Sequence, residues 1–251
     1  MTDDELFMKR VEELADLSYS RDIPVNTYFM DLHEQDLFMK VMNRRRTRYV
    51  LSGGFPAAER RLAVFLPSYM DEADEGIFPG VCVEAAPSSE KYAEELSHRD
   101  YLGALMSLGV DRNRLGDIMI DGKRAWFVCL AEISAYICDN LTSVRHTAVK
   151  CKECPWPEQL LAPRVEERRV SVSSERADAM VAAALRLSRN EAAELIRQEQ
   201  VYRNGSLVRS VSDQLRPDDI VSVRHKGRFI YYGADGTSKK GRTLVSLGIY
   251  R

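Results

Sequence analysis

The stretch LSRNEAAELIRQEQVYRNGSLV, residues 187–208, predicts a helix followed by a hairpin. Ser188 and Glu191 have the S-x-x-E spacing of a capping box, so we expect a helix to begin at this point. The apolar residues that follow recur at helical spacing and predict one buried face. Asn204-Gly205, between two short apolar runs, predicts a two-residue β-turn. The stretch therefore indicates a small helix-and-hairpin unit.

The polar side of this helix carries a second signal. At about 100° per residue, Arg189, Asn190 and Arg197 fall together on one flank, whereas the acidic side chains fall on the other. Guanidinium groups suit phosphate binding because their planar fork donates two parallel hydrogen bonds and stacks on bases. A solvated helix face would also carry such residues. Because several basic residues cluster here, we interpret the flank as an RNA-binding surface.

The charge distribution supports this interpretation. From Val165 onward the chain holds 16 Lys and Arg against 11 Asp and Glu, whereas the remainder holds 20 against 27. A polyanionic partner is therefore expected to meet the C-terminal portion. The predicted RNA-binding residues are Arg176, Arg186, Ser188, Arg189, Asn190, Arg197, Arg203, Asn204, Lys226, Arg228, Lys239, Lys240 and Arg242.

The composition places the chain among globular cytoplasmic proteins. Of its 251 residues, 45% are hydrophobic and 29% are charged, and no apolar run approaches the roughly 18–20 residues that cross a bilayer. The acidic N-terminus lacks the apolar region of a signal peptide. Five cysteines without framework spacing fit a reducing compartment. We expect a cytoplasmic monomer with no membrane partner.

Three segments follow from the order of the predicted elements. The first has helices over 5–19 and 32–44, the latter capped by Asp31, then a strand, a glycine turn and a strand over 49–67, and an acidic linker over 71–76. The second has strand 81–87, helix 98–110, two strands over 116–130 joined through Asp121-Gly122, helix 131–141 and strand 143–151. This β-α-β-β-α-β order is typical of ferredoxin-like and RRM-like domains.

The third segment begins after a linker marked by Pro155, Pro157 and Pro163. We expect a strand over 168–172, a helix over 176–186 capped by Ser174, and the helix-and-hairpin unit described above. Strands over 220–224, 228–233 and 243–250 then complete a small sheet.

Residues 176–223, RADAMVAAALRLSRNEAAELIRQEQVYRNGSLVRSVSDQLRPDDIVSV, resemble an S4-type RNA-binding domain. The family pattern is a second helix that starts with Ser-Arg, a strand that ends in Asn-Gly, and a Pro-Gly-Asp turn. The matching positions are Leu187, Ser188, Arg189, Ala192, Ile196, Val201, Asn204, Gly205, Pro217, Asp219 and Ile220. The departures are Ala177 for a leucine, Glu199 for the glycine that closes the second helix, Arg203 for a valine and Asp218 for the glycine of Pro-Gly-Asp.

A wider resemblance covers nearly the whole chain. The segments FMDLHEQDL, SGGFPAAERRLAVFLP, LSHRDYLGALMSLGVDRNRLGDI, AEISAYICDNLTSV, GRF and TSKKGR resemble the YlmH family in the same order. With the element order, this implies an α+β fold of three small domains: an N-terminal α/β domain (1–74), an RRM-like domain (75–160) and an S4 domain (165–251). The resemblance also implies a ribosome-associated factor that binds large-subunit rRNA. Family members are linked to rescue of subunits carrying peptidyl-tRNA, in ribosome-associated quality control, and to cell-division gene neighbourhoods.

We therefore predict a non-catalytic RNA-binding protein that associates with the large ribosomal subunit, contacts rRNA and peptidyl-tRNA, and needs no cofactor. One alternative is an RNA-modifying enzyme, because S4 domains are often appended to pseudouridine synthases, methyltransferases and tyrosyl-tRNA synthetases. The first 165 residues, however, show no glycine-rich methyl-donor loop or synthetase signature. The other alternative is a cell-division scaffold that docks through its acidic N-terminal domain.

Other motifs do not indicate catalysis or metal binding. His98-Arg99-Asp100 resembles the kinase catalytic triplet, but the required asparagine is missing, and we expect the triplet to begin a helix. Cys151 and Cys154 have zinc-knuckle spacing without a second pair, whereas a structural zinc needs four ligands. We predict no metal site.

Overall fold

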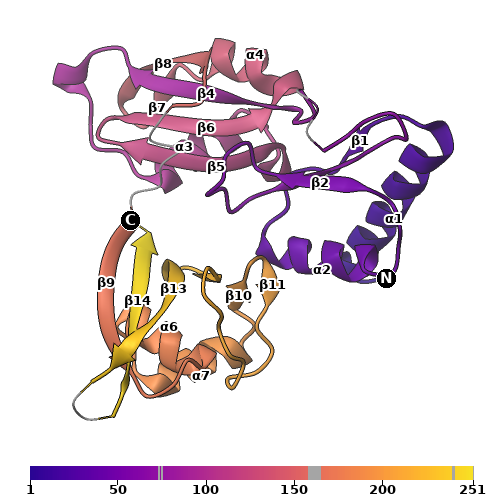
Figure 1. The fold of residues 1–251 in the computed structure, drawn as a ribbon. Coiled ribbons are helices and arrows are strands. Elements are labelled where there is room, and N and C mark those ends of the chain that lie inside the picture. The colour runs from indigo at the N-terminus through magenta and orange to yellow at the C-terminus, as the bar shows by residue number, and fades with distance from the viewer. Residues whose placement is uncertain (73, 75, 158–164, 239–240, 251) are drawn as a thin grey trace. The chain divides into compact units, whose positions relative to one another are not determined.

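The computed structural model describes residues 1–72, 74, 76–157, 165–238 and 241–250. The chain folds into two compact units, residues 1–162 and 163–251, each with helices packed on antiparallel sheets (Figure 1). This mixture confirms the α+β class. The first unit contains two sheets, and the domain boundaries at 74 and 160 remain a prediction. Within the described residues, every helix is too short or too polar to span a lipid bilayer.

The N-terminal segment of the first unit packs two helices on a small sheet. Its elements are α1 Asp3–Arg21, β1 Val25–Asn26, α2 Leu32–Met42, β2 Tyr49–Ser52 and β3 Leu62–Phe65. The strands lie in the order β1-β3-β2 and pair antiparallel. Both helices begin with a capping box, and the carboxylate of Asp31 accepts the Glu34 N–H at 2.9 Å. The predicted cap at Asp31 is confirmed.

The rest of the first unit has the predicted β-α-β-β-α-β order. Its elements are β4 Gly80–Pro87, the 3₁₀ turn η1 Glu90–Tyr92, α3 His98–Ser107, the 3₁₀ turn η2 Arg112–Arg114, β5 Leu115–Asp121, β6 Arg124–Leu130, α4 Ala131–Asn140, β7 Ser143–Val144 and β8 Thr147–Cys154. The sheet order is β5-β6-β4-β8-β7 and every pair is antiparallel. This is the RRM-like arrangement, with the short strand β7 added at one edge.

The hairpin between β5 and β6 differs from the prediction by one residue. Asp121 pairs with Arg124, so the turn residues are Gly122 and Lys123 rather than Asp121 and Gly122. Gly122 takes a positive φ of 60°, which glycine adopts without strain. The glycine therefore occupies the first turn position, and Asp121 remains in the strand.

The N-terminal segment packs against one face of the middle sheet. Phe29 and Leu62 share a hydrophobic core with Cys82 of β4 and with Val128 and Leu130 of β6. This is the face opposite α3 and α4, because Cys129, which lies between the two β6 residues, is buried among the residues of those helices. One end of the outer face of this sheet is therefore covered by the chain itself.

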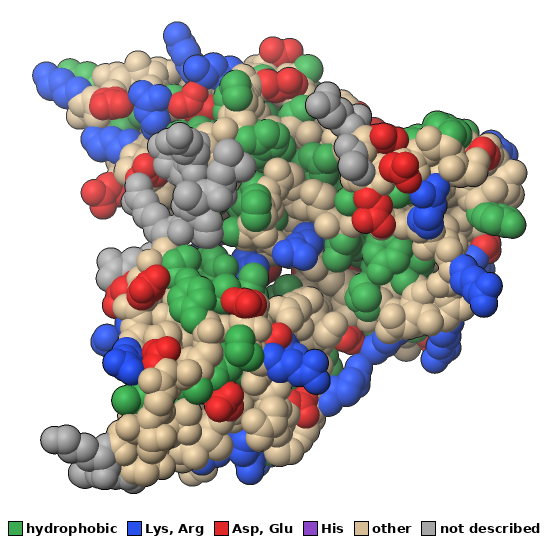
Figure 2. All heavy atoms as spheres, in the orientation of Figure 1, with side chains coloured by type: hydrophobic (Ala, Val, Ile, Leu, Met, Phe, Trp, Pro, Cys, Tyr) green, Lys and Arg blue, Asp and Glu red, His purple; other side chains and the backbone are tan. Residues whose placement is uncertain are grey.

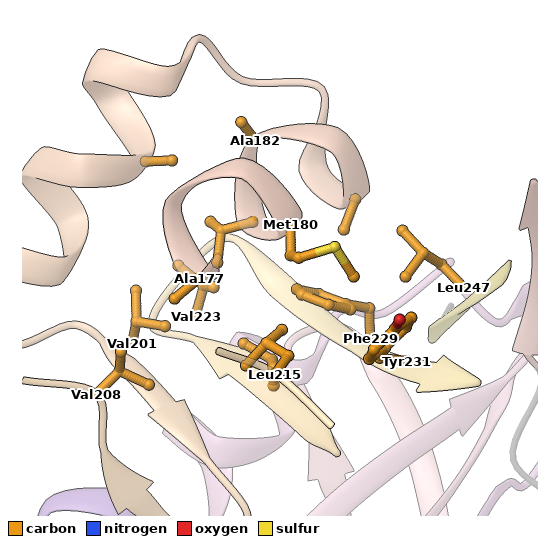
Figure 3. Packing of buried hydrophobic residues seen from close by; sticks show 14 of the residues in the cluster. Ala177, Met180, Ala182, Val201, Val208, Leu215, Val223, Phe229, Tyr231 and Leu247 are labelled. Carbon is orange, nitrogen blue, oxygen red and sulfur yellow. The ribbon is translucent and has the colours of Figure 1, made fainter. Parts of the chain in front are cut away.

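The second unit places two helices on one face of a six-stranded sheet. Its elements are β9 Val165–Val172, α6 Ala177–Leu185, α7 Arg189–Arg197, β10 Val201–Arg203, β11 Ser206–Leu207, β12 Ile220–Val223, β13 Gly227–Thr237 and β14 Thr243–Tyr250, and the strand order is β11-β10-β12-β13-β14-β9. In Figure 3, Met180 of α6 lies over Phe229 of the sheet, and Ala177 lies beside Val223. The small residues of α6 let the helix approach the aromatic rings closely.

The start of α6 corrects one prediction. The helix begins at Ala177 with Arg176 as its N-cap, so Ser174 is not the cap, and the Arg176 side chain makes no capping hydrogen bond. A backbone bridge between Arg176 and Gln214, together with the hydrogen bond from the Ala177 N–H to the Asp213 carbonyl (2.7 Å), fixes this end instead. These tertiary contacts, and not a side-chain cap, hold the first residues of α6 in place.

Candidate RNA-binding site

The junction between α6 and α7 presents a short exposed turn. Helix α6 ends with Arg186 in the left-handed conformation (φ 56°), and the Leu187 N–H donates to the Ala182 carbonyl at 3.0 Å. Helix α7 begins directly after Ser188, whose hydroxyl accepts the Glu191 N–H at 3.1 Å. The predicted capping box is confirmed. Its geometry directs the side chains of residues 186–190 outward, where all except Leu187 are exposed.

A turn from the sheet approaches this junction. A Cβ added to Gly227, which follows Lys226 in the β12–β13 turn, would lie 3.5 Å from Leu185 Cδ2 at the end of α6. The pKa of Glu191 is lowered, mainly by the Ser188 N–H and hydroxyl and also by the charge of Lys226. Lys226 therefore lies near the start of α7. We call the set Arg186, Ser188, Arg189, Asn190 and Lys226 the junction cluster.

A buried carboxylate holds two arginines beside the cluster. Asp178 in the first turn of α6 is only 6% exposed. It accepts hydrogen bonds from Arg176 Nε (3.3 Å) and from Arg189 Nη2, and Arg189 Nη1 donates to Ser173 Oγ at 3.2 Å. The two guanidinium groups remain about 40–50% exposed, at 38% and 48%. One carboxylate thus fixes two partly exposed cations and leaves the local charge positive.

The contacts continue toward the β10–β11 hairpin. Arg203 Nη1 donates to the carbonyl of Gln214 (3.0 Å), the residue bridged to Arg176, and Arg203 Nε lies 4.0 Å from Asp219 Oδ2. Arg189, Arg176 and Arg203 therefore form a connected row, which we call the arginine row. The structure brings these three predicted residues together with the junction cluster.

Asn204 has an internal role in the hairpin. It occupies the first turn position with φ 52°, and Gly205 follows with φ 85°, as a type I′ turn requires. Its Nδ2 donates to Asp219 Oδ1 (2.8 Å), and its Oδ1 accepts the Ile220 N–H (2.9 Å). The predicted hairpin is confirmed. The side-chain amide is used inside the protein, so the RNA contact that the sequence predicts for Asn204 needs a direct test.

The basic flank of α7 is less segregated than its angular spacing indicated. Arg197 pairs with Glu194 at 3.3 Å, an i,i+3 contact on the exposed side of the helix. The two positions are separated by about 60° on a helical wheel, which long side chains span easily. Arg197 therefore carries a partner that the prediction had placed on the opposite flank.

Other predicted residues lie away from the junction cluster. Arg228 precedes the core residue Phe229 on β13, so alternation places it on the opposite sheet face, where its guanidinium lies 4.8 Å from the centre of the Tyr250 ring. Arg242 lies in the β13–β14 connection, where its N–H donates to Ser238 Oγ at 3.0 Å. Lys239 and Lys240 lie outside the described residues.

The two turns that lack their expected glycine are nevertheless formed. Glu199 has φ 58°, the Gln200 N–H donates to Leu195 O at 3.0 Å, and the Glu199 N–H donates to Ile196 O at 3.1 Å. These are the two bonds of a Schellman motif. Asp218 has φ 70° at the second central position of the turn that Pro217 opens. The surrounding fold imposes both conformations on residues with a side chain.

Three residues of this surface were missed by sequence reasoning. Asp178 and Asp219 organise the arginines, and acids are not expected at an RNA surface, although Asp178 follows Arg176 by two residues in a first helical turn. The exposed Arg216 directly precedes Pro217, and its N–H donates to Asp219 Oδ2 at 2.7 Å. Its place beside a turn was the available signal.

The cysteine pair with zinc-knuckle spacing lies within the described residues. They contain no group of three or more His, Cys, Asp and Glu side chains that could hold a metal ion. Cys151 and Cys154 lie three positions apart on β8 and so face opposite sides of the sheet. Cys154 Sγ lies 3.7 Å from Cys82 Sγ, whereas Cys151 Sγ contacts the Leu141 carbonyl. The two thiols do not converge.

Comparison with known proteins agrees with this architecture. Residues 86–158 match the family described as putative RNA-binding domain in YlmH, and residues 175–221 match the S4 domain. The chain is 28% identical over 224 residues to ribosome-associated protein quality control protein P2 of Bacillus subtilis (strain 168), which covers 88% of this chain and 85% of that protein. The structure of cell division protein ylmH from Streptococcus pneumoniae is similar in fold, with 20% identity and a TM-score of 0.54, over 64% of this chain and 96% of that one.

Proposed function

We propose that this chain, a YlmH-type protein with a C-terminal S4 domain, is a non-catalytic cytoplasmic factor that binds RNA on the large ribosomal subunit. The relative from Bacillus subtilis is named for ribosome-associated protein quality control, which supports a role in that process for this chain. In this proposal the second unit contacts rRNA and the peptidyl-tRNA, and no bond is made or broken.

The observation that carries the proposal is the arginine row beside the junction cluster. Asp178 fixes the guanidinium groups of Arg176 and Arg189, so little side-chain entropy is lost when they meet a phosphate. The side chains of Arg186 and Lys226 are exposed and add further positive charge to this surface. The fixed cations Arg176 and Arg189 can recognise the shape of a folded RNA, and the exposed cations Arg186 and Lys226 raise the affinity of the protein for it.

The surface is suited to contact the backbone and unpaired bases of a structured RNA, and not to read base edges in the deep major groove of an RNA helix. A-form helices hide their base edges in a narrow major groove, so proteins read phosphates, 2′-hydroxyls and unpaired bases. The exposed turn at residues 186–190 can approach a phosphate backbone closely, and Asn190 and Ser188 offer hydrogen bonds to 2′-hydroxyls. Such binding could hold a peptidyl-tRNA in place on the subunit while a partner acts.

The proposal can be tested by co-sedimentation of the full chain with purified large subunits over a salt titration. We expect the double variant Arg186→Gln/Lys226→Gln to bind several-fold more weakly, with a salt slope reduced by about 1–2, because roughly one counterion is released per phosphate contact. The matched control Arg21→Gln/Arg169→Gln removes the same charge elsewhere and should bind like the natural protein. Equal binding by both double variants would refute the junction cluster as the RNA contact.

Two further measurements separate the alternative functions. Mass analysis of rRNA and tRNA from a deletion strain would reveal a lost modification if the chain were an RNA-modifying enzyme. For a cell-division scaffold, the Arg186→Gln/Lys226→Gln variant would complement the deletion fully even though it binds subunits more weakly. We expect no lost modification and no complementation.

A further inference from the structure

The outer face of the middle sheet, opposite α3 and α4, is only partly covered. At one end Cys82, Val128 and Leu130 are buried beneath the N-terminal segment. RRM-like sheets usually bind RNA by stacking bases on aromatic residues of this face. The N-terminal segment occupies that position here, so the covered end offers no stacking platform.

The other end of the face is open and basic. Glu84 pairs across the sheet with Trp126 on one side and Lys152 on the other. In the next row, Lys150 is paired with Ala86, and Arg124 with Asp121. Because side chains alternate along a strand, all these cations project from the outer face.

A buried carboxylate organises two of these cations. Glu84 is 7% exposed and accepts hydrogen bonds from Arg124 Nη1 at 2.9 Å and from Lys152 Nζ at 3.2 Å. Burial raises the pKa of Glu84, but the hydrogen bonds from Lys152 and Arg124 outweigh burial and lower it overall. The carboxylate is therefore ionised and holds two cations that are 47% and 70% exposed.

The β5–β6 turn adds further cations and an exposed ring. Lys123 Nζ donates to the Glu90 carbonyl at 2.7 Å, and Arg124 Nη2 lies 3.5 Å from Glu90 Oε1. These contacts hold η1 against the turn. Within η1, Lys91 lies 5.4 Å from the ring centre of Tyr92, whose side chain is among the most exposed aromatics, at 75%.

We call the five cations the basic sheet end; they are Lys91, Lys123, Arg124, Lys150 and Lys152. Three carboxylates lie among them, so the surface keeps a positive excess although the first unit as a whole is acidic. Figure 2 shows basic side chains gathered, among acidic ones, at the end of this sheet toward the segment that follows β4. The net charge of the first unit does not indicate this basic surface, because its cations come from three separate parts of the sequence.

We propose that the basic sheet end is a second RNA-binding surface, which binds the phosphodiester backbone of an unpaired strand and stacks a base on Tyr92. The cations come from strands and turns at one end of the sheet, so several can contact phosphates of one backbone, and Tyr92 supplies the ring that single-strand binding uses. An acidic peptide would satisfy the lysines but would gain nothing from the ring. These residues lie within the match to a family described as putative RNA-binding domain, and the inference goes beyond that description in naming the face, the residues and an unpaired strand. It rests on the proposed function only in taking RNA as the ligand.

The test uses the full chain and a fluorescent single-stranded oligouridylate as the probe. The variant Lys91→Gln/Lys123→Gln/Lys150→Gln leaves the Glu84 pairs intact. We expect its salt slope for probe binding to fall by about 2, at ~0.7 per lost phosphate contact, and its affinity at low salt to fall roughly tenfold or more. The control Lys9→Gln/Arg21→Gln/Arg46→Gln removes three exposed charges from the N-terminal segment and should behave like the natural protein. Identical slopes for the two triple variants would overturn the proposal.

Two additional arms identify the ligand class and separate this inference from the proposed function. Tyr92→Leu should weaken probe binding by roughly 5–100-fold, whereas Tyr92→Phe should retain it, because stacking needs the ring and not the hydroxyl. If polyglutamate of matched charge competes as well as the probe, the surface binds acidic proteins and the RNA assignment fails. If Arg186→Gln/Lys226→Gln loses subunit binding while the lysine triple variant keeps probe binding, only this inference fails; the reverse result removes only the proposed function.

Discussion

Arg189, in the first turn of α7, donates a hydrogen bond from Nη2 to the buried carboxylate of Asp178 on α6. The contact joins the two helices across the junction and also presents the guanidinium at the surface, where it is 48% exposed. Arg189 therefore serves both the fold and the proposed RNA surface. Arg186, three residues earlier, is exposed and forms no ion pair with any described residue.

This difference predicts that the two arginines separate stability from binding. Arg189→Gln should lower the free energy of unfolding by about 1–3 kcal/mol, because Asp178 loses a charged partner in a buried position. It should also weaken subunit binding. Arg186→Gln should weaken binding and leave the free energy of unfolding within about 0.5 kcal/mol of the natural protein. Urea denaturation and subunit co-sedimentation measure the two effects, and equal stability losses would contradict the structure.

A second prediction concerns the left-handed residues Glu199 and Asp218. A residue with a side chain pays about 1–2 kcal/mol to adopt a positive φ, and a glycine at the same position avoids this cost. The greater flexibility of glycine in the unfolded chain offsets part of the resulting stabilisation. Glu199→Gly should therefore raise the free energy of unfolding by about 0.5–1 kcal/mol, and Asp218→Gly by less, because aspartate tolerates this region better. Glu199→Ala should give no such gain. If alanine stabilises as much as glycine, removal of the charge and not the backbone conformation is responsible.

The third prediction tests whether Asn204 stabilises the hairpin or contacts RNA directly. Asn204→Ala removes the hydrogen bonds to Asp219 and Ile220 and should lower the free energy of unfolding by about 1–3 kcal/mol. Asn204→Gly should be more stable than Asn204→Ala only by the cost that alanine pays to adopt a positive φ. Measured well below the unfolding midpoint, RNA affinity should be within about twofold of the natural value, because the amide is already occupied. A large loss of affinity in the folded glycine variant would show a direct RNA contact.

The lowered pKa of Glu84 gives a pH-dependent prediction. A carboxyl whose folded pKa lies below its ordinary value of 4.5 stabilises the fold above that pH, and the contribution is lost as pH falls through the folded pKa. Glu84→Gln should therefore be less stable than the natural protein at pH 7, by about 1–3 kcal/mol. The difference should shrink steadily below pH 4.5. Thermal unfolding of both proteins between pH 7 and pH 3 checks this, and a constant difference would exclude the ion pairs as its cause.

Local patterns in the sequence determined most of the framework. The capping residues Ser188 and Asp31 act through the next three positions of their own helices, and Asn204-Gly205 acts within its own turn, so their outcome needs no distant partner. These features depend on short-range backbone geometry, which the sequence alone specifies.

Only the tertiary structure decided which predicted site residues act together. Arg176 and Arg189 share Asp178, and Gln214 links Arg176 to Arg203. These links depend on residues from separate parts of the chain. Arg228 is carried to the opposite face by strand alternation. Tertiary structure also brings together the groups on the middle sheet, because the covering N-terminal segment and the cations around Glu84 come from distant parts of the chain. The sequence by itself determined the elements and their caps because these are local, whereas side-chain partners were decided by packing, which brings distant residues together.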